Sequence, residues 1–257
     1  MRVPSLLVHP NWEHPAPVVL WMHGRTVNKE LDPGRYLRWM RAGIAAISVD
    51  LPGHGERLDA VLQAPKRSLD VLAQMRAEID GIIHELSTSE YAKVFDLTRL
   101  AIGGMSLGGM VTLRRLCDPH PYIAAAVECT TGFLRGLYIP GEYADAPRWN
   151  VEHDPEQVRK LDPSLHLGEW KPIPLLALHT EADEIVPEET QKRFISELKE
   201  HYAKLGHNPD LIEYLTWPQT GAPQEHAGFG RFSNDAKNAQ TDFFIKHLTP
   251  NKKHPSM

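Results

Sequence analysis

The chain has 257 residues, of which 42% are hydrophobic and 24% charged, and its formal net charge is −5. No linker-like segment and no internal repeat divides it, so we expect residues 1–257 to form one domain with a sizeable core. The basic residues are scattered, which argues against a nucleic-acid-binding face and a membrane-surface helix. The expected partner is therefore a small molecule, and the expected assembly is a monomer or a homodimer.

The two cysteines, Cys117 and Cys129, lie in different segments. They predict buried thiols rather than a disulfide framework or a zinc cluster. Histidines and carboxylates are not grouped at metal-ligand spacing, so we expect neither a metal nor a cofactor. Residues 1–10 resemble neither a signal peptide nor a membrane anchor, because prolines and a histidine interrupt the apolar run. The expected location is the cytoplasm.

Short apolar runs alternate with amphipathic segments along the chain. The runs predict strands at Ser5 to Val8, Val18 to Met22, Ile44 to Val49, Leu100 to Ile102, Ile123 to Val127, Leu175 to Leu178 and Leu211 to Leu215. Helices are predicted at Pro33 to Arg41, Ser68 to Leu86, Leu107 to Cys117, Pro187 to Lys204 and Asn234 to His247. This alternation indicates an α/β fold with a mostly parallel sheet covered by helices on both faces, and a site at the carboxyl ends of the strands.

The interval from Thr130 to Pro172 interrupts this alternation. It is rich in aromatic residues: Phe133, Tyr138, Tyr143, Trp149 and Trp170. Long segments without regular structure are uncommon unless they serve a function, so residues 130–172 predict a small lid with short helices over the site. The alternative is an insertion that only packs against the core.

A nucleophile elbow is predicted at Gly104-Met105-Ser106-Leu107-Gly108, between a strand and a helix. A strained turn there lifts the serine hydroxyl above the sheet edge, and the two glycines leave room for crossing backbone. Ser106 is the candidate nucleophile. The amide of Leu107 is a candidate donor to the oxyanion that forms during acyl transfer.

A serine hydroxyl needs a base, and the base needs a carboxylate to hold it. Asp183 follows the strand at Leu175 to Leu178, and His226 lies in the loop after the last predicted strand. The chain order of serine, acid and histidine is the order of the α/β-hydrolases. The strand at Val18 to Met22 ends in His-Gly, and the backbone amide of the next residue, Arg25, is the second candidate oxyanion donor.

Four motifs together resemble the α/β-hydrolase family, close to its esterase and prolyl-oligopeptidase-like branch, which includes dienelactone-hydrolase-like proteins. They are His23-Gly24-Arg25, Asp50-Leu51-Pro52-Gly53-His54-Gly55-Glu56-Arg57, Gly104-Met105-Ser106-Leu107-Gly108-Gly109 and His179-Thr180-Glu181-Ala182-Asp183-Glu184-Ile185-Val186-Pro187. The resemblance implies a catalytic triad of Ser106, Asp183 and His226, with the amides of Arg25 and Leu107 as oxyanion hole. It also implies hydrolysis of an ester, thioester or amide through an acyl-enzyme. Two departures are the arginine at position 25 and fewer N-terminal strands than the family's eight-stranded sheet needs.

Several neighbouring residues have an alternative interpretation. Glu181 and Glu184 could replace Asp183, and His54 could replace His226, although the family pattern makes His54 part of a structural turn. His23 and His179 are expected to support the site through hydrogen bonds. Glu128 and Cys129 are expected to line the pocket, with Cys129 as an apolar filler rather than a nucleophile. For the Arg25 side chain, a salt bridge to the acidic loop at residues 50–56 competes with a clamp for a substrate carboxylate or phosphate.

The function expected from these residues is a serine hydrolase that cleaves carboxylic esters of small to medium acyl groups. One alternative is an aminopeptidase, acylpeptide or thioester hydrolase, without the propeller domain that large peptidases of this branch carry. Another is a member of the fold that binds a ligand or a partner protein without catalysis.

Overall fold

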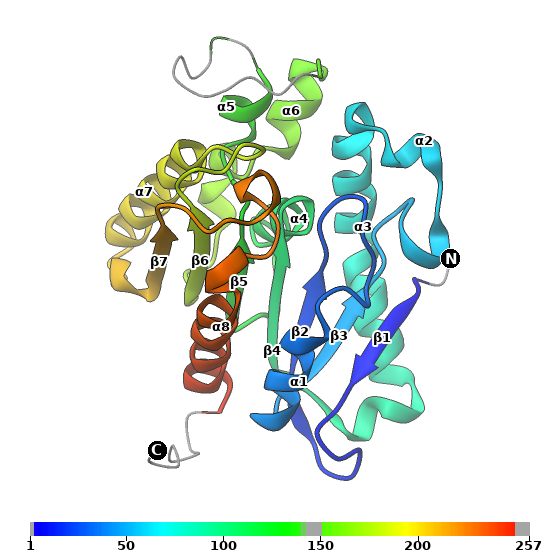
Figure 1. Ribbon diagram of the computed structural model, residues 1–257. Coiled ribbons are helices and arrows are strands. Elements are labelled where there is room, and N and C mark those ends of the chain that lie inside the picture. Colours follow the sequence, from blue (N-terminus) through cyan, green and yellow to red (C-terminus); the bar gives the residue numbers. More distant parts are fainter. Residues whose placement is uncertain (1–2, 140, 142–150, 250–257) are drawn as a thin grey trace.

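The computed structural model describes residues 3–139, 141 and 151–249. Within these ranges a seven-stranded sheet has the order β1-β3-β2-β4-β5-β6-β7, and β1 is the antiparallel strand at one edge (Figure 1). The strands are β1 (Ser5–Val8), β2 (Ala16–Met22), β3 (Ala45–Val49), β4 (Phe95–Met105), β5 (Ala124–Glu128), β6 (Leu175–Thr180) and β7 (Ile212–Trp217). The remaining neighbours pair in parallel.

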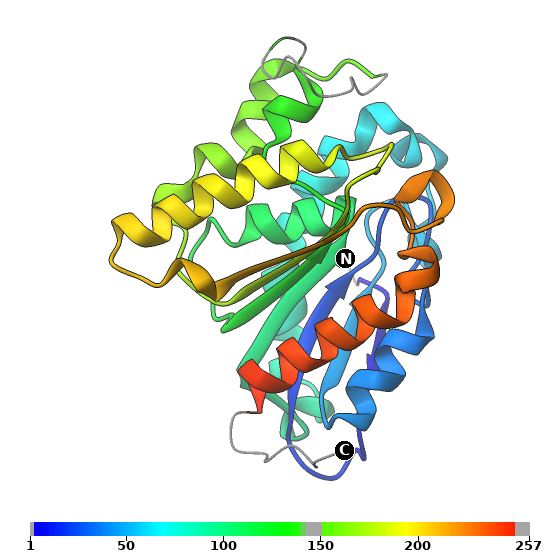
Figure 2. The ribbon, with the colours of Figure 1, turned by 60° about the vertical axis from the view of Figure 1, so that its left-hand side comes forward.

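Helices cover both faces of the sheet. They are α1 (Pro33–Arg41), α2 (Ala60–Gln63), α3 (Ser68–Thr88), α4 (Leu107–Arg115), α5 (Leu134–Tyr138), α6 (Pro155–Leu161), α7 (Glu188–Lys204) and α8 (Ser233–Leu248). Figure 2 shows α1 and α8 side by side on one face, with α3, α4 and α7 across the sheet from them. Two apolar clusters fill the space between these layers, one on each face of the sheet.

The central strands are apolar on both sides because both faces are covered. Every residue of β2, β3, β5 and β6 is buried, which explains their continuous apolar runs. On the α8 side, Trp39 of α1 packs edge to face against Trp21 and Phe244, with ring centroids 5.6 Å and 5.3 Å apart. On the other side, the apolar stripe of α3 from Leu69 to Leu86 is buried as its periodicity predicts.

The predicted fold is confirmed. Each predicted strand and helix exists, with ends displaced by a few residues. The largest difference is β4, which begins at Phe95 rather than Leu100, because a polar stretch precedes its apolar part and pairs with the start of β2. The described strands number seven, in line with the expected shortage at the N-terminal side.

The segment from 130 to 172 is only partly described. Tyr143 and Trp149 lie outside the described residues, so the lid as a whole remains a proposal. Trp170 belongs to the core instead: its side chain is buried, and its indole N–H donates to the hydroxyl of Tyr202 at 2.9 Å. Tyr138, at the end of α5, reaches the cavity that contains Ser106. The described part of the insertion therefore both packs against the core and lines the site.

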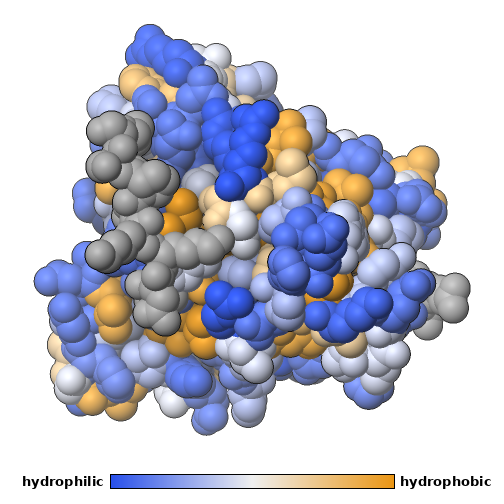
Figure 3. Space-filling model, turned by 90° about the horizontal axis from the view of Figure 1, so that it is seen from below, coloured by the Kyte–Doolittle hydropathy of each residue, from blue (hydrophilic) through white to orange (hydrophobic). Residues whose placement is uncertain are grey.

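Figure 3 shows the molecule from below, away from the carboxyl ends of the parallel strands. Outside the grey atoms, the surface seen in this view has small hydrophobic areas separated by hydrophilic ones. Among the described helices, none combines the length and the apolar character needed to cross a bilayer.

Candidate active site

The turn between β4 and α4 has the geometry of a nucleophile elbow. Ser106 has φ 50° and ψ −117°, a strained conformation for a residue with a side chain. A Cβ added to Gly104 would lie 2.4 Å from the carbonyl carbon of Gly108, and one added to Gly108 would lie 2.3 Å from the oxygen of Met22. Only glycine leaves room for this close backbone crossing, so the predicted reason for both glycines is confirmed.

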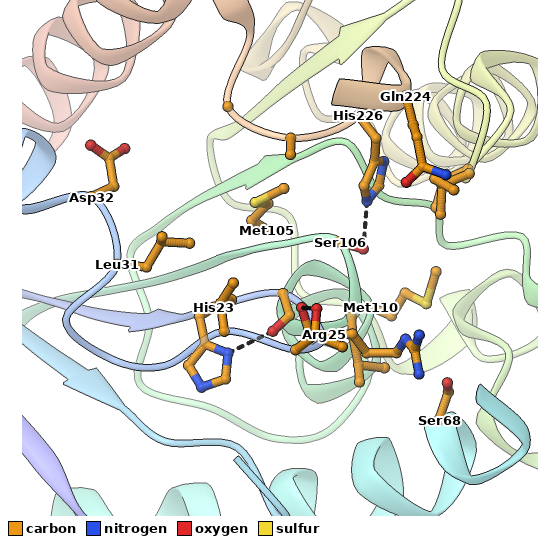
Figure 4. A pocket seen from close by; sticks show the side chains of 18 of the residues that line it. His23, Arg25, Leu31, Asp32, Ser68, Met105, Ser106, Met110, Gln224 and His226 are labelled. Carbon is orange, nitrogen blue, oxygen red and sulfur yellow. Dashed lines mark hydrogen bonds between the residues drawn. The ribbon is translucent and has the colours of Figure 1, made fainter. Parts of the chain in front are cut away.

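The structure brings Ser106, His226 and Asp183 together from three separate loops at the carboxyl ends of β4, β7 and β6. His226 Nε2 lies 2.9 Å from Ser106 Oγ (Figure 4). On the other side of the ring, His226 Nδ1 lies 2.8 Å from Asp183 Oδ2. Because Nδ1–H donates to the carboxylate, Nε2 carries the lone pair that accepts the serine proton. This order of contacts can move a proton from Ser106 to His226.

Three donors hold Asp183 in place, and His179, which also contacts the carbonyl of Val186 at 2.9 Å, lies beside it. Its Oδ1 accepts the amides of Ile185 and Val186 at 2.9 Å and 2.8 Å, and its Oδ2 lies 3.4 Å from His179 Nε2 as well as near His226. Burial raises the pKa of Asp183, but the contacts with His179 and His226 outweigh burial and keep the pKa below its ordinary value. The carboxylate therefore stays ionised beside the imidazole, and His179 supports it as expected.

The loop that carries His226 is stabilised by a carboxylate of its own. Glu225 Oε2 accepts the amide and the hydroxyl of Thr220 at 2.6 Å and 2.7 Å, and Oε1 accepts the amide of Gly221 at 2.7 Å. The amide of Glu184 donates to the carbonyl of Gln224 at 3.1 Å, which joins the loop of Asp183 to the loop of His226. Sequence analysis did not identify Glu225, because its partners are two backbone amides and one hydroxyl of a turn that has no fixed sequence pattern.

His23 shapes the loop that follows β2. Its Nδ1–H donates to the carbonyl of Gly24 at 2.6 Å, and its Nε2 accepts the amide of Leu51 at 3.1 Å. Burial lowers the pKa of His23 to about 4, so the ring is neutral at physiological pH. Gly24 is close enough to the elbow that an added Cβ would lie 3.4 Å from Ser106 Cβ. His23 thus fixes the backbone from which the amide of Arg25 would act.

Neither candidate oxyanion amide, that of Arg25 or that of Leu107, has a protein acceptor within residues 3–139, 141 and 151–249. Both residues line the same cavity as Ser106. Two free amides beside a serine hydroxyl can stabilise negative charge on a carbonyl oxygen.

The cavity has a volume of about 420 Å³, which suits a small or medium ligand. Figure 4 shows Arg25, Met110 and Ser68 on one side of Ser106, and Leu31 and Asp32 on the opposite side. The other described residues that line the cavity are Trp21, His23, Gly24, Thr26, Val27, Arg35, Met105, Leu107, Tyr138, Ile185, Val186, Gln224, His226, Ala227, Gly228 and Lys237. The cavity therefore extends to both sides of Ser106, and we call these two parts its arms.

The arm on the Asp32 side contains a charge network that sequence analysis missed. Arg35, of α1, donates to both carboxylate oxygens of Glu128 at 2.6 Å and 2.8 Å, and to Asp32 at 3.2 Å. Gln240 contacts the same pair, and Lys237 lies 3.1 Å from Asp32. Arg35 and Glu128 are 93 positions apart in the chain, so no local pattern could have linked them.

Two expectations for the pocket are wrong. Glu128 and Cys129 do not line the cavity: Glu128 is buried against Arg35, and Cys129 is buried next to the loop of Asp183. The salt bridge expected for Arg25 is also wrong, because its Nη1 donates to the carbonyl of Gln63 at 2.7 Å and no carboxylate in the described ranges pairs with it. Both errors arise where side-chain direction depends on the packed neighbours.

The loop at residues 50–57 is a structural turn, as the family pattern implies. The carboxylate of Asp50 accepts the amides of Lys29 and Glu56 and pairs with the Lys29 ammonium at 3.0 Å. His54 is buried and bonded to the carbonyl of Pro52 at 2.8 Å, and among the described residues no hydrogen bond joins it to Ser106 or Asp183. His54 is therefore not positioned as the base, and Glu181 and Glu184 do not contact His226 within the described residues.

Cys129, Asp183 and His226 are the described residues whose donor atoms come close enough to hold a metal ion. Burial raises the pKa of the Cys129 thiol well above its ordinary value, and Asp183 and His226 already bind each other. A protonated thiol is a poor metal ligand, so this donor set does not fit a resident metal.

Comparison with known proteins places this geometry in context. The family model described as "Alpha/beta hydrolase family" matches residues 6–232. The chain is 25% identical over 261 residues to the protein named "Esterase YjfP" of Escherichia coli (strain K12), covering 96% of each chain.

Solved structures resemble the fold at lower identity. Pyrococcus horikoshii acylaminoacyl peptidase matches all of this chain over 41% of its own length, with a TM-score of 0.72 and 19% identity. TT1662 from Thermus thermophilus matches 98% of this chain over its full length, with a TM-score of 0.68 and 19% identity. These similarities support the fold and leave the substrate to be argued from the site.

Proposed function

Because the chain belongs to the alpha/beta hydrolase family, we propose that it is a serine hydrolase that cleaves carboxylic esters of small to medium acyl groups. The single observation that carries the proposal is the contact of His226 Nε2 with Ser106 Oγ at 2.9 Å, with Asp183 at 2.8 Å on the other ring nitrogen. An imidazole held in this tautomer between a carboxylate and a strained serine is the arrangement that acyl transfer requires.

In the proposed mechanism Ser106 Oγ attacks the ester carbonyl while His226 Nε2 takes the hydroxyl proton. Asp183 stabilises the imidazolium that results, and the amides of Arg25 and Leu107 bind the oxyanion. The alcohol leaves with the proton from His226, and Ser106 remains acylated. Water then gives a proton to His226 and attacks the acyl group. His226 returns that proton to Ser106 Oγ as the bond to the acyl group breaks, which releases the acid and restores the serine.

The charge around the cavity favours an ester over a peptide with a free amino terminus. Recognition of an α-ammonium group needs an available carboxylate. Asp32, the acidic residue among the described cavity-lining residues, is already bonded to Arg35 and Lys237. The name of the E. coli relative, an esterase, supports the same reaction class.

An acylaminoacyl peptidase activity is the second candidate, since such a substrate has a blocked amino terminus and needs no carboxylate from the enzyme. The structural similarity to the P. horikoshii acylaminoacyl peptidase supports it through the fold alone. Rates on an acylaminoacyl amide and on its matched ester would separate the two candidates.

The decisive experiment is the initial rate on p-nitrophenyl esters from acetate to dodecanoate with the wild type, Ser106→Ala and Ser196→Ala. Ser196 is exposed on α7 and provides a matched serine control. We expect Ser106→Ala to lower kcat by about four to six orders of magnitude, and Ser196→Ala to leave it unchanged. Equal rates for a folded Ser106→Ala variant would refute the mechanism. The chain length with the highest rate would define the acyl pocket.

A fluorophosphonate probe provides an independent test. We expect it to label Ser106 in the wild type, because the same activated oxygen would attack phosphorus. Failure to label, together with no rate on any ester, would favour a member of the fold that binds without catalysis.

A further inference from the structure

Arg25 is a cation in the cavity of Ser106 that no carboxylate of the described residues neutralises. Its side chain is half-buried and lies on the Ser68 and Met110 side of Ser106 (Figure 4). One of its five N–H groups donates to the carbonyl of Gln63 at 2.7 Å. In the part of the chain that the structure describes, no carboxylate pairs with the guanidinium.

The described neighbours of Arg25 do not supply negative charge. Burial lowers the pKa of Arg25, because the guanidinium has lost part of its contact with water and no described anion compensates for that loss. The ionisable groups that affect it or that it affects are Tyr138 and His54. Burial raises the pKa of Tyr138 and lowers that of His54, so both are neutral at pH 7.

The other cations of the cavity are compensated within the fold. Arg35 is bonded to Glu128 and Asp32, and Lys237 is paired with Asp32. Among the described residues that line the cavity, Arg25 is therefore the cation available to an anionic ligand. A single guanidinium balances a monoanion, and its planar fork matches the two oxygens of a carboxylate. A phosphate dianion would need further donors that are engaged elsewhere.

We propose that Arg25 binds an ionised carboxylate of the substrate, in the arm of the cavity formed by Arg25, Ser68, Met110 and Tyr138. The substrate class is then an ester that carries a second, free carboxylate a few atoms from the scissile carbonyl. This inference rests on the proposed function, because it assigns the substrate of the same serine site. Arg25 has two separate roles in it, the amide toward the oxyanion and the guanidinium toward the carboxylate.

The test compares carboxylated and neutral esters of matched length. Monoethyl glutarate against ethyl pentanoate places the charge on the acyl side, and 3-(butanoyloxy)propanoate against propyl butanoate places it on the alcohol side. We expect kcat/KM for the charged member of one pair to exceed that of its neutral partner by about tenfold to a hundredfold, as a charge-assisted hydrogen bond provides. A ratio at or below one for both pairs would overturn the proposal.

The ratio of kcat/KM for the charged ester to kcat/KM for the neutral ester separates the effect of the Arg25 side chain from the effect of its backbone amide. A change in the oxyanion amide affects both members of a pair alike, whereas loss of the guanidinium affects only the charged member. We expect Arg25→Gln to reduce the ratio to about one, and Arg25→Lys, a point charge without the fork, to give an intermediate ratio. An unchanged ratio in Arg25→Gln would contradict the proposal.

Lys237→Gln is the matched control, because it removes a cation that is already paired at the other end of the cavity. We expect it to preserve the ratio. An equal loss of ratio in Lys237→Gln and Arg25→Gln would show a general effect of positive potential and would overturn the assignment to Arg25.

A binding measurement distinguishes failure of this inference from failure of the proposed function. Monoethyl glutarate is titrated calorimetrically into Ser106→Ala and into Ser106→Ala with Arg25→Gln. Tighter binding to the first protein, by about tenfold or more, supports the carboxylate site even if no ester is turned over. Equal binding to both refutes the site, whatever the rates on neutral esters show about Ser106.

Discussion

Arg25 and Arg35 line the same cavity but meet different surroundings. Arg35 is buried and bonded to Glu128, Gln240 and Asp32, and its guanidinium lies 4.3 Å from the ring centroid of Trp21. Arg25 is half-buried and has a backbone carbonyl as its described hydrogen-bond partner. A cation that is paired with carboxylates of the fold stabilises the structure around it. A cation without such a counter-ion is available to an anionic ligand. The residue type alone does not separate these roles.

The largest effect on stability is expected from breaking the Arg35 network. Glu128→Gln leaves the buried guanidinium with the more distant carboxylate of Asp32, and we expect it to lower the free energy of unfolding by about 3–5 kcal/mol. Urea denaturation measures the change. The double variant Arg35→Met with Glu128→Leu should recover most of the loss, because it removes both charges together. A loss below about 1 kcal/mol in Glu128→Gln would show that the pair is not structural.

The second largest effect is expected in the pH dependence of the free energy of unfolding, to which His23 in the loop before Arg25 contributes. The pKa of His23 is about 4 in the folded chain and 6.5 in the ordinary state. The unfolded chain therefore takes up a proton at a higher pH than the folded chain does. The stabilising contribution of the neutral ring is complete above pH 6.5 and is lost as the pH falls from 6.5 to 4. Its size is at most about 3 kcal/mol.

Denaturation at pH 7.5 and at pH 4.5 tests this prediction in the wild type and in His23→Gln, which cannot take up the proton. We expect the variant to lose less stability between the two pH values than the wild type. Parallel losses in both proteins would assign the acid sensitivity to other groups.

The smallest effect on stability is expected at Arg25. Arg25→Met removes one hydrogen bond to Gln63 but also removes a partly desolvated charge, so the two contributions oppose each other. We expect a change of about 1 kcal/mol or less in the free energy of unfolding, measured as for Glu128→Gln. A loss as large as that of Glu128→Gln would make Arg25 a structural residue and would remove the contrast between the two arginines.

The sequence by itself determined the order of strands and helices along the chain. It also predicted that Ser106, Asp183 and His226 follow strands that end at the same edge of the sheet. These predictions depend on local chemistry. Apolar periodicity reports which face is buried, and Gly104 and Gly108 report a crossing too close for a side chain. Parallel strands end at one edge of the sheet, so residues that follow different strands are brought close whatever their distance along the chain.

The tertiary structure alone decided how the charged side chains pair. Glu128 directly follows the apolar run of β5, which suggested a pocket position, but α1 places Arg35 against it and turns it into the core. The loop at residues 50–56 was the expected partner of Arg25, but Lys29 occupies its carboxylates and Gln63 receives the guanidinium instead. Long side chains select partners by direction and burial, which depend on elements that are distant in the sequence. That selection separates an arginine paired within the fold from one that faces the cavity without a carboxylate partner among the described residues.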